Sequence, residues 1–365
     1  MLGRILRACA IVMLLVVAPA VLAACGDDKS EADVEPTSGP ARSFMMGFSS
    51  LPRELNADSY EDAIDFADKH GDIVLIQRSV PWADFAPNAE ISDETAHNTA
   101  SEKKAIDRDG LSVFFAIDPT DGATGRDRLS NLPVSLAGKK FDDPAVRAAF
   151  VAYAEYVALN YKPDYMALGV EMNLYYEKNK DDFENFKSLY AQAYDAVKKK
   201  SPHTQVTVTF QYEDLQALLP REDRHYTEWQ LISAFEPRTD FTAISTYPSF
   251  AFPNADAIPD YYYTQLRAFT DKPIAIAEMG YASTAGADGV NSGTEADQSA
   301  FVERIMDEAQ DMDMPFVVWF AIWDPTYARD TAFGAFQNIG LLRDDDSEKP
   351  AWQFWATNVR RPYRP

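Results

Sequence analysis

Eight short apolar runs recur between residues 44 and 320, and they constrain the fold of this chain more than any other feature of its sequence. Each run is continuous rather than alternating, as expected of strands that are covered on both faces. They lie at 44–48, 73–77, 112–117, 165–170, 205–210, 241–246, 273–277 and 315–320. The intervening stretches show helical periodicity, most clearly at 59–70, 143–160, 181–200 and 295–311.

This strand–helix alternation predicts a parallel sheet with helices packed against it. Eight units, with no glycine-rich dinucleotide motif after the first run, favour a closed (β/α)₈ barrel over an open doubly wound sheet. We therefore expect an α/β protein whose single TIM-barrel domain occupies residues 43–365.

The N-terminus has the features of an export signal. Arg4 and Arg7 precede residues 8–24, which carry no charge and are short for a membrane span. The run ends in Leu-Ala-Ala-Cys at Cys25, a tetrapeptide that resembles the bacterial lipoprotein box. The resemblance implies that residues 1–24 are removed and that Cys25 is acylated. The alternative is an ordinary secretory signal whose small residues happen to precede a cysteine.

Residues 25–42 are polar and lack apolar periodicity, so we expect a flexible linker that holds the barrel away from the lipid. The protein would then lie in the bacterial cell envelope, on the outer side of a membrane, and would touch that membrane only through its anchor. Cys9 and Cys25 are the chain's two cysteines, so the mature domain has no disulfide.

The charge of the chain is strongly acidic. Removing residues 1–24 takes away two arginines and no acid, so the net charge goes from −23 to −25. Such a surface argues against nucleic acid or other anionic polymers as partners. A neutral polysaccharide or oligosaccharide is compatible with it, and we expect a monomer.

Catalytic groups of such barrels lie at the C-terminal ends of the strands. The residues found there are Ser49 and Ser50, Gln77 and Arg78, Asp118, Glu171 and Asn173, Gln211 and Glu213, Tyr247, Glu278, and Trp323 with Asp324. Glu171 and Glu278 follow the fourth and seventh runs, which place them across the barrel mouth from each other. Glycoside hydrolysis needs such a pair, one acid to protonate the leaving oxygen and one anion to attack the sugar. The alternative for each is a strand-end acid paired with a neighbouring base.

Several of these segments resemble the large clan of retaining glycoside hydrolases built on (β/α)₈ barrels. Residues 272–281 (KPIAIAEMGY) look like the clan's nucleophile strand, and Glu171-Met172-Asn173 is similar to the acid/base segment of family 26 β-mannanases. The resemblance implies that Arg78 hydrogen-bonds the nucleophile and that Tyr247 orients it, much as in the galactanase family. It also implies that Trp323 forms the floor under a sugar ring.

One residue departs from the pattern. Most clan members have asparagine directly before the acid/base, and the mannanases have histidine, but this chain has Val170. That asparagine normally binds the 2-hydroxyl of the sugar. Asn173 is a candidate substitute donor. A catalytically silent barrel that only binds carbohydrate therefore remains an alternative to the enzyme.

The side chains of other residues near the strand ends have two possible roles each. Asp118 and Gln211 would bind sugar hydroxyls or cap the following helix, and Trp82 would stack on a sugar or fill the core. The four histidines lack metal-ligand spacing, so we expect neither a metal nor another cofactor. An aldolase-type barrel would need a strand-end lysine, which the sequence lacks. The prediction is a retaining, endo-acting glycosidase for a β-linked polysaccharide or oligosaccharide.

Overall fold

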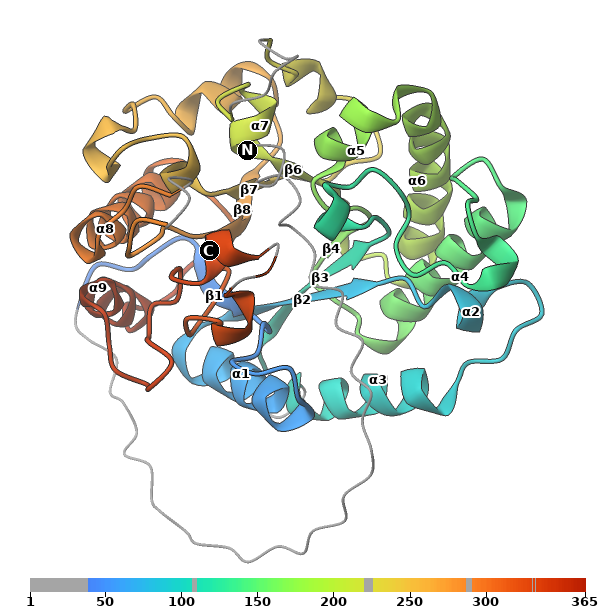
Figure 1. Cartoon of the computed structure of the whole chain (residues 1–365), viewed down its shortest axis with the longest axis horizontal. Helices are drawn as coiled ribbons and strands as arrows, with labels where there is room; N and C mark the ends of the chain where they lie inside the picture. The colour runs from blue at the N-terminus through green and yellow to red at the C-terminus, as the bar shows by residue number, and fades with distance from the viewer. Residues whose placement is uncertain (1–38, 107–109, 220–225, 287–290, 330, 332) are drawn as a thin grey trace, which may run out of the picture.

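The computed structural model of this protein describes residues 39–106, 110–219, 226–286, 291–329, 331 and 333–365. The predicted signal segment, Cys25 and most of the linker lie outside these ranges. Within them, one parallel sheet lies at the centre of the molecule and the helices surround it (Figure 1). None of the described helices is long and apolar enough to cross a membrane.

The sheet has nine strand segments in the order β5-β4-β3-β2-β1-β9-β8-β7-β6. They are β1 (Met45–Ser49), β2 (Ile73–Ser79), β3 (Ser112–Asp118), β4 (Tyr165–Ala167), β5 (Gln205–Thr207), β6 (Thr209–Gln211), β7 (Thr242–Thr246), β8 (Ile274–Met279) and β9 (Phe316–Trp319). Only Val208 separates β5 from β6, so these two ends of the sheet are halves of one strand. The sheet therefore closes on itself as a ring of eight strands, which confirms the predicted barrel.

Nine α-helices are assigned in the described ranges. They are α1 (Ala57–His70), α2 (Trp82–Phe85), α3 (Asp93–Ile106), α4 (Pro144–Asn160), α5 (Met172–Lys178), α6 (Lys180–Lys200), α7 (Tyr212–Leu215), α8 (Glu295–Asp311) and α9 (Pro350–Val359). The four clearest predicted helices correspond to α1, α4, α6 and α8. The connection from β7 to β8 contains only 3₁₀ turns among its assigned helical elements.

Local sequence fixes where these helices begin. Asp143 accepts hydrogen bonds from the N–H groups of the first turn of α4, and proline occupies the first helical position. Thr294 and Asp297 form a reciprocal capping box at the start of α8. These caps satisfy backbone donors that would otherwise be left without partners.

Two apolar layers explain why the strands read as continuous apolar runs. Ile73 and Leu75 of β2 belong to the cluster inside the barrel, whereas Val74 and Ile76 pack in the cluster between the sheet and the helices. Successive side chains of a strand point to opposite faces, so both layers demand apolar residues. The same alternation determines which side chains at the strand ends face the barrel mouth.

The two ends of the described chain meet at the N-terminal end of the barrel. Arg42 and Tyr363 form a parallel bridge, and the Arg42 guanidinium lies 2.7 Å from Asp72, which directly precedes β2. Residues 39–42 therefore enter the barrel at the end opposite to the strand ends that carry Glu171 and Glu278.

Candidate active site

Glu278 faces the barrel mouth because β8 is irregular at this point. Ala275 and Ala277 lie in the inner apolar cluster, whereas Ile276 and Met279 lie in the outer one. Strict alternation would turn Glu278 outward. The pairing of β8 with both neighbours shifts after Ile276, as in a β-bulge. The extra residue redirects the carboxylate inward.

Tyr247 binds Glu278 directly. Its hydroxyl donates to Glu278 Oε2 over 3.1 Å, which is the contact that the sequence resemblance implies. A buried carboxylate on α7, Glu213, holds this tyrosine in place. Glu213 Oε1 accepts the Tyr247 N–H at 3.0 Å, the Thr246 hydroxyl at 2.6 Å and the Tyr262 hydroxyl at 2.7 Å. Glu213 is thus a site-supporting residue to which the sequence analysis gave no role.

Glu171 lies at the start of α5 with a left-handed backbone, φ 50° and ψ 48°. This conformation is uncommon for a residue with a side chain. The Glu171 N–H donates to Thr209 Oγ1 at 2.9 Å, which ties the residue to β6. Gly169 permits the close approach of the helix, because a Cβ there would lie 2.7 Å from Met172 Cγ. Glu171 itself is fully buried.

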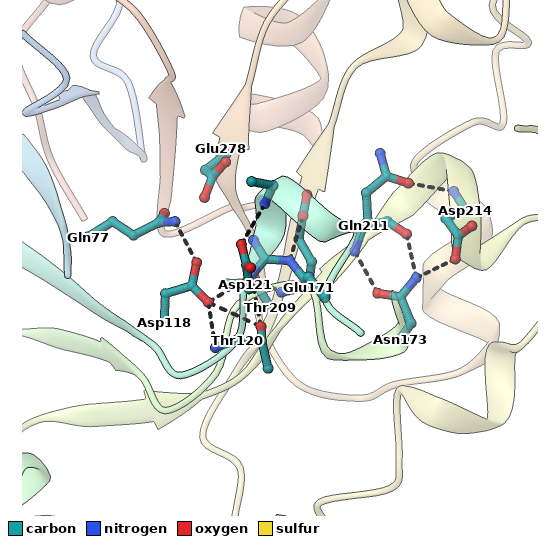
Figure 2. Close-up of polar contacts among 12 residues, drawn as sticks. Gln77, Asp118, Thr120, Asp121, Glu171, Asn173, Thr209, Gln211, Asp214 and Glu278 are labelled. Carbon is teal, nitrogen blue, oxygen red and sulfur yellow. Dashed lines mark hydrogen bonds and ion pairs between the residues drawn. The ribbon is translucent and has the colours of Figure 1, made fainter. Parts of the chain in front are cut away.

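An arginine that the sequence analysis missed binds two acids of the site. Arg126, on the loop after β3, donates from Nε to Glu171 Oε2 at 3.0 Å. Its Nη1 donates to Asp118 Oδ1 at 2.7 Å. Gln77 Nε2 donates to the other oxygen of Asp118 at 3.2 Å, and this contact lies close to Glu278 in Figure 2. Arg126 comes from the middle of a loop, where no strand-end rule could identify it.

The electrostatic environment of Glu278 favours its neutral form. Burial is the largest influence and raises the pKa of Glu278, and the negative charges of Glu171 and Asp118 raise it further. Arg126 and the hydrogen bond from Tyr247 act in the opposite direction. The net result is a pKa raised from 4.5 to about 8. The two carboxylates are thus electrostatically coupled.

The prediction that Arg78 binds the nucleophile is wrong. Its Nε donates to Glu102 Oε1 on α3 at 3.0 Å, and its guanidinium stacks on the Tyr60 ring. Arg78 follows the outward-facing Ile76 at a spacing of two, so it points towards the helices. The inward position belongs to Gln77, which binds Asp118. The strand alternation could have supplied this correction.

The two tryptophans proposed to contact sugar lie elsewhere. Trp82 is 1% exposed, packs in the outer core, and donates its indole N–H to the Ser130 carbonyl at 2.7 Å. Trp323 packs against Phe66 of α1 and donates to Asp346 Oδ1 at 2.9 Å. After β9 the aromatic beside Tyr247 is Phe320, with ring centroids 6.1 Å apart.

Asn173 and Gln211 serve the protein's own backbone. Asn173 Nδ2 donates to the Gln211 carbonyl at 3.0 Å and to Asp214 Oδ2 at 2.9 Å, and its Oδ1 accepts the Gln211 N–H. Gln211 Oε1 caps α7 by accepting the Asp214 N–H at 2.6 Å. Figure 2 shows this network on the side of Glu171 away from Asp118. The Asn173 side chain is thus fully occupied by contacts within the protein. The side chain of Val170 is buried and apolar, so it cannot bind a sugar hydroxyl in its place.

The arrangement supports acid–base and nucleophilic chemistry at carboxylates. Two buried glutamates interact at the barrel mouth, one bound by an arginine and one by a tyrosine hydroxyl. No group of three or more histidine, cysteine, aspartate or glutamate side chains that could hold a metal ion occurs among the described residues.

The barrel is similar to several solved structures of carbohydrate-active enzymes. An exo-β-1,4-mannosidase from Opitutaceae bacterium strain TAV5 aligns with a TM-score of 0.65 and 15% identity, over 89% of this chain and 60% of that chain. A GH5_18 protein from Streptomyces cattleya, in complex with GlcNAc, gives 0.64 and 20%, over 89% and 83%. A family 17 β-1,3-glucanosyltransferase from Rhizomucor miehei gives 0.54 and 15%, over 84% and 96%.

This chain therefore spans three-fifths of the length of the mannosidase and most of the length of the other two proteins. No family model and no curated protein matches its sequence. At these identities the likeness establishes the architecture alone: the chain has the (β/α)₈-barrel fold of these glycoside hydrolases.

Proposed function

We propose that the protein is a retaining glycoside hydrolase in which Glu278 is the nucleophile and Glu171 the general acid/base. The observation that carries the proposal is the pair of interacting, buried carboxylates at the ends of β8 and β4, with the Tyr247 hydroxyl bonded to Glu278. A double displacement requires two carboxyl groups that act together, one as nucleophile and one as general acid/base.

The proposed reaction has two steps. The Glu278 carboxylate attacks the anomeric carbon while Glu171 gives its proton to the departing glycosidic oxygen. Glu171, now a carboxylate, then removes a proton from water, which attacks the same carbon and releases Glu278. Two inversions at one carbon give retention. During each step Tyr247 stabilises the charge on Glu278.

The proposed substrate is a β-linked polysaccharide or oligosaccharide, cleaved internally. The similar structures include a GH5_18 variant from Streptomyces cattleya in complex with Manβ1-4GlcNAc and the β-1,3-glucanosyltransferase, both of which concern β-linked sugars. A neutral sugar chain also suits a protein whose net charge is −23. We further propose export to the bacterial cell envelope with a lipid anchor at Cys25.

One observation favours the second candidate, a silent carbohydrate-binding barrel. Glu171 is fully buried and its carboxylate is paired with Arg126, so in this conformation no sugar oxygen can reach it. Val170 and Asn173 also offer no donor for a 2-hydroxyl. The test must therefore distinguish binding from turnover.

The decisive experiment measures released reducing ends from mannans, galactans, xylans and glucans. The wild type should hydrolyse at least one of them, and Glu278→Ala should hydrolyse none. Glu171→Ala should still react with an activated aryl glycoside, and added azide should accelerate breakdown of its trapped intermediate with retained stereochemistry. Glu184→Ala, on the exposed surface of α6, serves as the control. A wild type that binds oligosaccharide tightly without hydrolysing any substrate would support the silent barrel.

A further inference from the structure

The loop after β3 folds back on itself as a short hairpin, here called the β3 hairpin (residues 119–130). An antiparallel bridge between Thr120 and Leu129 closes its base. At its tip Gly125 and Arg126 are both left-handed, with φ values of 73° and 62°. Arginine rarely adopts this backbone conformation, so contacts of its side chain must compensate for the cost.

Those contacts are charge-assisted hydrogen bonds to two acids on neighbouring strands. The Arg126 side chain is 1% exposed and reaches Glu171 at 3.0 Å and Asp118 at 2.7 Å. Such bonds are strong where water is excluded, and they require the carboxylate form of the acceptor. Arg126 therefore favours the ionised state of Glu171.

The second glutamate has the opposite environment. The Tyr247 hydroxyl donates a hydrogen bond to Glu278, and the negative charges of Glu171 and Asp118 raise the pKa of Glu278. Arg126 lowers the pKa of Glu278 only from a distance, and burial outweighs it. The cation thus binds Glu171 whereas Glu278 has only a neutral donor, so a single proton shared by the pair favours Glu278.

We infer that Arg126 is a positioning residue that pairs with Glu171, keeps the proton of the site on Glu278 in the substrate-free protein, and must release Glu171 before the two glutamates can react. This inference rests on the proposed two-glutamate mechanism. That mechanism starts from the opposite arrangement, a protonated Glu171 and an ionised Glu278. When Arg126 withdraws, the proton leaves the Glu278 carboxyl and one is taken up by the Glu171 carboxylate, so the charge of the pair is unchanged.

The same movement would open the site. While Arg126 is in place Glu171 is fully buried, so a glycosidic oxygen could approach it only after the guanidinium has moved. Release would also allow the tip of the β3 hairpin to leave its left-handed backbone conformation. Substrate binding at the barrel mouth would thus replace the contacts of Arg126 with Glu171 and Asp118 by other contacts of Arg126.

Proton occupancy can be measured without turnover. We would label glutamate at the side-chain carboxyl carbon with ¹³C in the whole exported domain, residues 25–365, and follow chemical shifts against pH. Glu171→Gln and Glu278→Gln identify the two signals. In the wild type Glu278 should keep its proton to a higher pH than Glu171. In Arg126→Met the pKa of Glu171 should rise by at least one unit and by more than that of Glu278, so the gap between the two titrations should narrow.

The matched control is Arg128→Met on the same hairpin, because Arg128 is exposed and pairs with Asp121. It should leave both titrations unchanged. Arg126→Lys, which keeps the charge if Arg126→Met fails to fold, should preserve the wild-type order. Glu171→Gln should lower the pKa of Glu278. A wild type in which Glu171 is protonated while Glu278 is ionised would overturn the inference. An unchanged gap between the two titrations in folded Arg126→Met would do the same.

The titration separates the two proposals. If the wild type hydrolyses nothing but shows the expected proton order, the proposed function fails and the role of Arg126 in holding that order stands. If hydrolysis is found and the order is reversed, the enzyme stands and the inference about Arg126 fails.

Discussion

Tyr247 and Glu278 are joined by a hydrogen bond of 3.1 Å whose donor has little freedom to move. The Tyr247 ring stacks on Phe250 and meets the edge of Phe336, with centroid distances of 5.5 and 5.0 Å. Its backbone N–H is held by Glu213. These three contacts preorganise the Tyr247 hydroxyl for the Glu278 carboxylate, which in the proposed reaction reduces the reorganisation needed when charge develops on Glu278.

Tyr247→Phe should reduce kcat/KM by about ten- to a hundredfold, because a preorganised donor to the reacting carboxylate is lost. This hydrogen bond lowers the pKa of Glu278, so its removal should also shift the limb of the pH–rate profile that Glu278 governs to higher pH. Tyr190→Phe is the control, since its hydroxyl donates to the Arg238 carbonyl far from the site. It should cost about 1 kcal/mol of stability and leave the pH profile unchanged.

The raised pKa of Glu278 predicts a pH-dependent stability. A carboxyl whose pKa is higher in the folded state than in the unfolded state stabilises the fold below the unfolded value of 4.5. That contribution is lost as the pH rises through about 8. The free energy of unfolding of the wild type should therefore fall relative to that of Glu278→Gln across this window, by a few kcal/mol at most.

Urea unfolding at several pH values would measure this difference between the two proteins. The free energy of unfolding of Glu184→Gln should change with pH as that of the wild type does, because the Glu184 carboxylate is exposed on α6. Parallel curves for Glu278→Gln and the wild type would show that Glu278 titrates normally, and would remove the electrostatic support for the coupled pair.

Periodicity predicted the barrel because every strand packs against two apolar layers. That requirement leaves a continuous apolar run in the sequence, and eight such runs set the topology. The same reasoning predicted that Glu171 and Glu278 follow the fourth and seventh strands. It could not predict that Glu278 faces inward, since a bulge in β8 reverses the alternation there.

The errors in the site have physical causes. Arg78 and Trp323 were assigned from short motifs, although strand alternation turns Arg78 outward and favours Phe320 over Trp323. Arg126 could not be found from periodicity, because it lies on a hairpin whose path depends on tertiary contacts. Asn173 looked available only because its partners, Gln211 and Asp214, are 38 or more residues away in the sequence.

Gly47 provides a test of the barrel packing itself. A Cβ at this position of β1 would lie 1.8 Å from the Ile73 carbonyl oxygen, which is backbone and cannot move aside. Gly47→Ala should therefore destabilise the protein by about 3 kcal/mol or more and lower the yield of folded protein. Gly334→Ala is the matched control, because the nearest atom is 3.8 Å away, and its effect should stay within about 0.5 kcal/mol. Thermal unfolding of both variants would decide, and equal melting temperatures would contradict the described β1–β2 packing.

Cys25→Ser tests the proposed anchor. The Leu-Ala-Ala-Cys tetrapeptide follows an uncharged run, so we expect cleavage before Cys25 and acylation of its sulfur. In a bacterial host the wild type should incorporate labelled palmitate and partition into detergent, whereas Cys25→Ser should lose both properties and keep its hydrolytic activity. Residues 39–42 enter at the barrel end opposite to Glu171 and Glu278, so an anchor upstream of them should leave the mouth accessible to a polymer. Cys9→Ser, within the segment that we expect to be removed, should behave as the wild type. Unchanged partitioning of Cys25→Ser would instead support an ordinary secretory signal or another mode of membrane attachment.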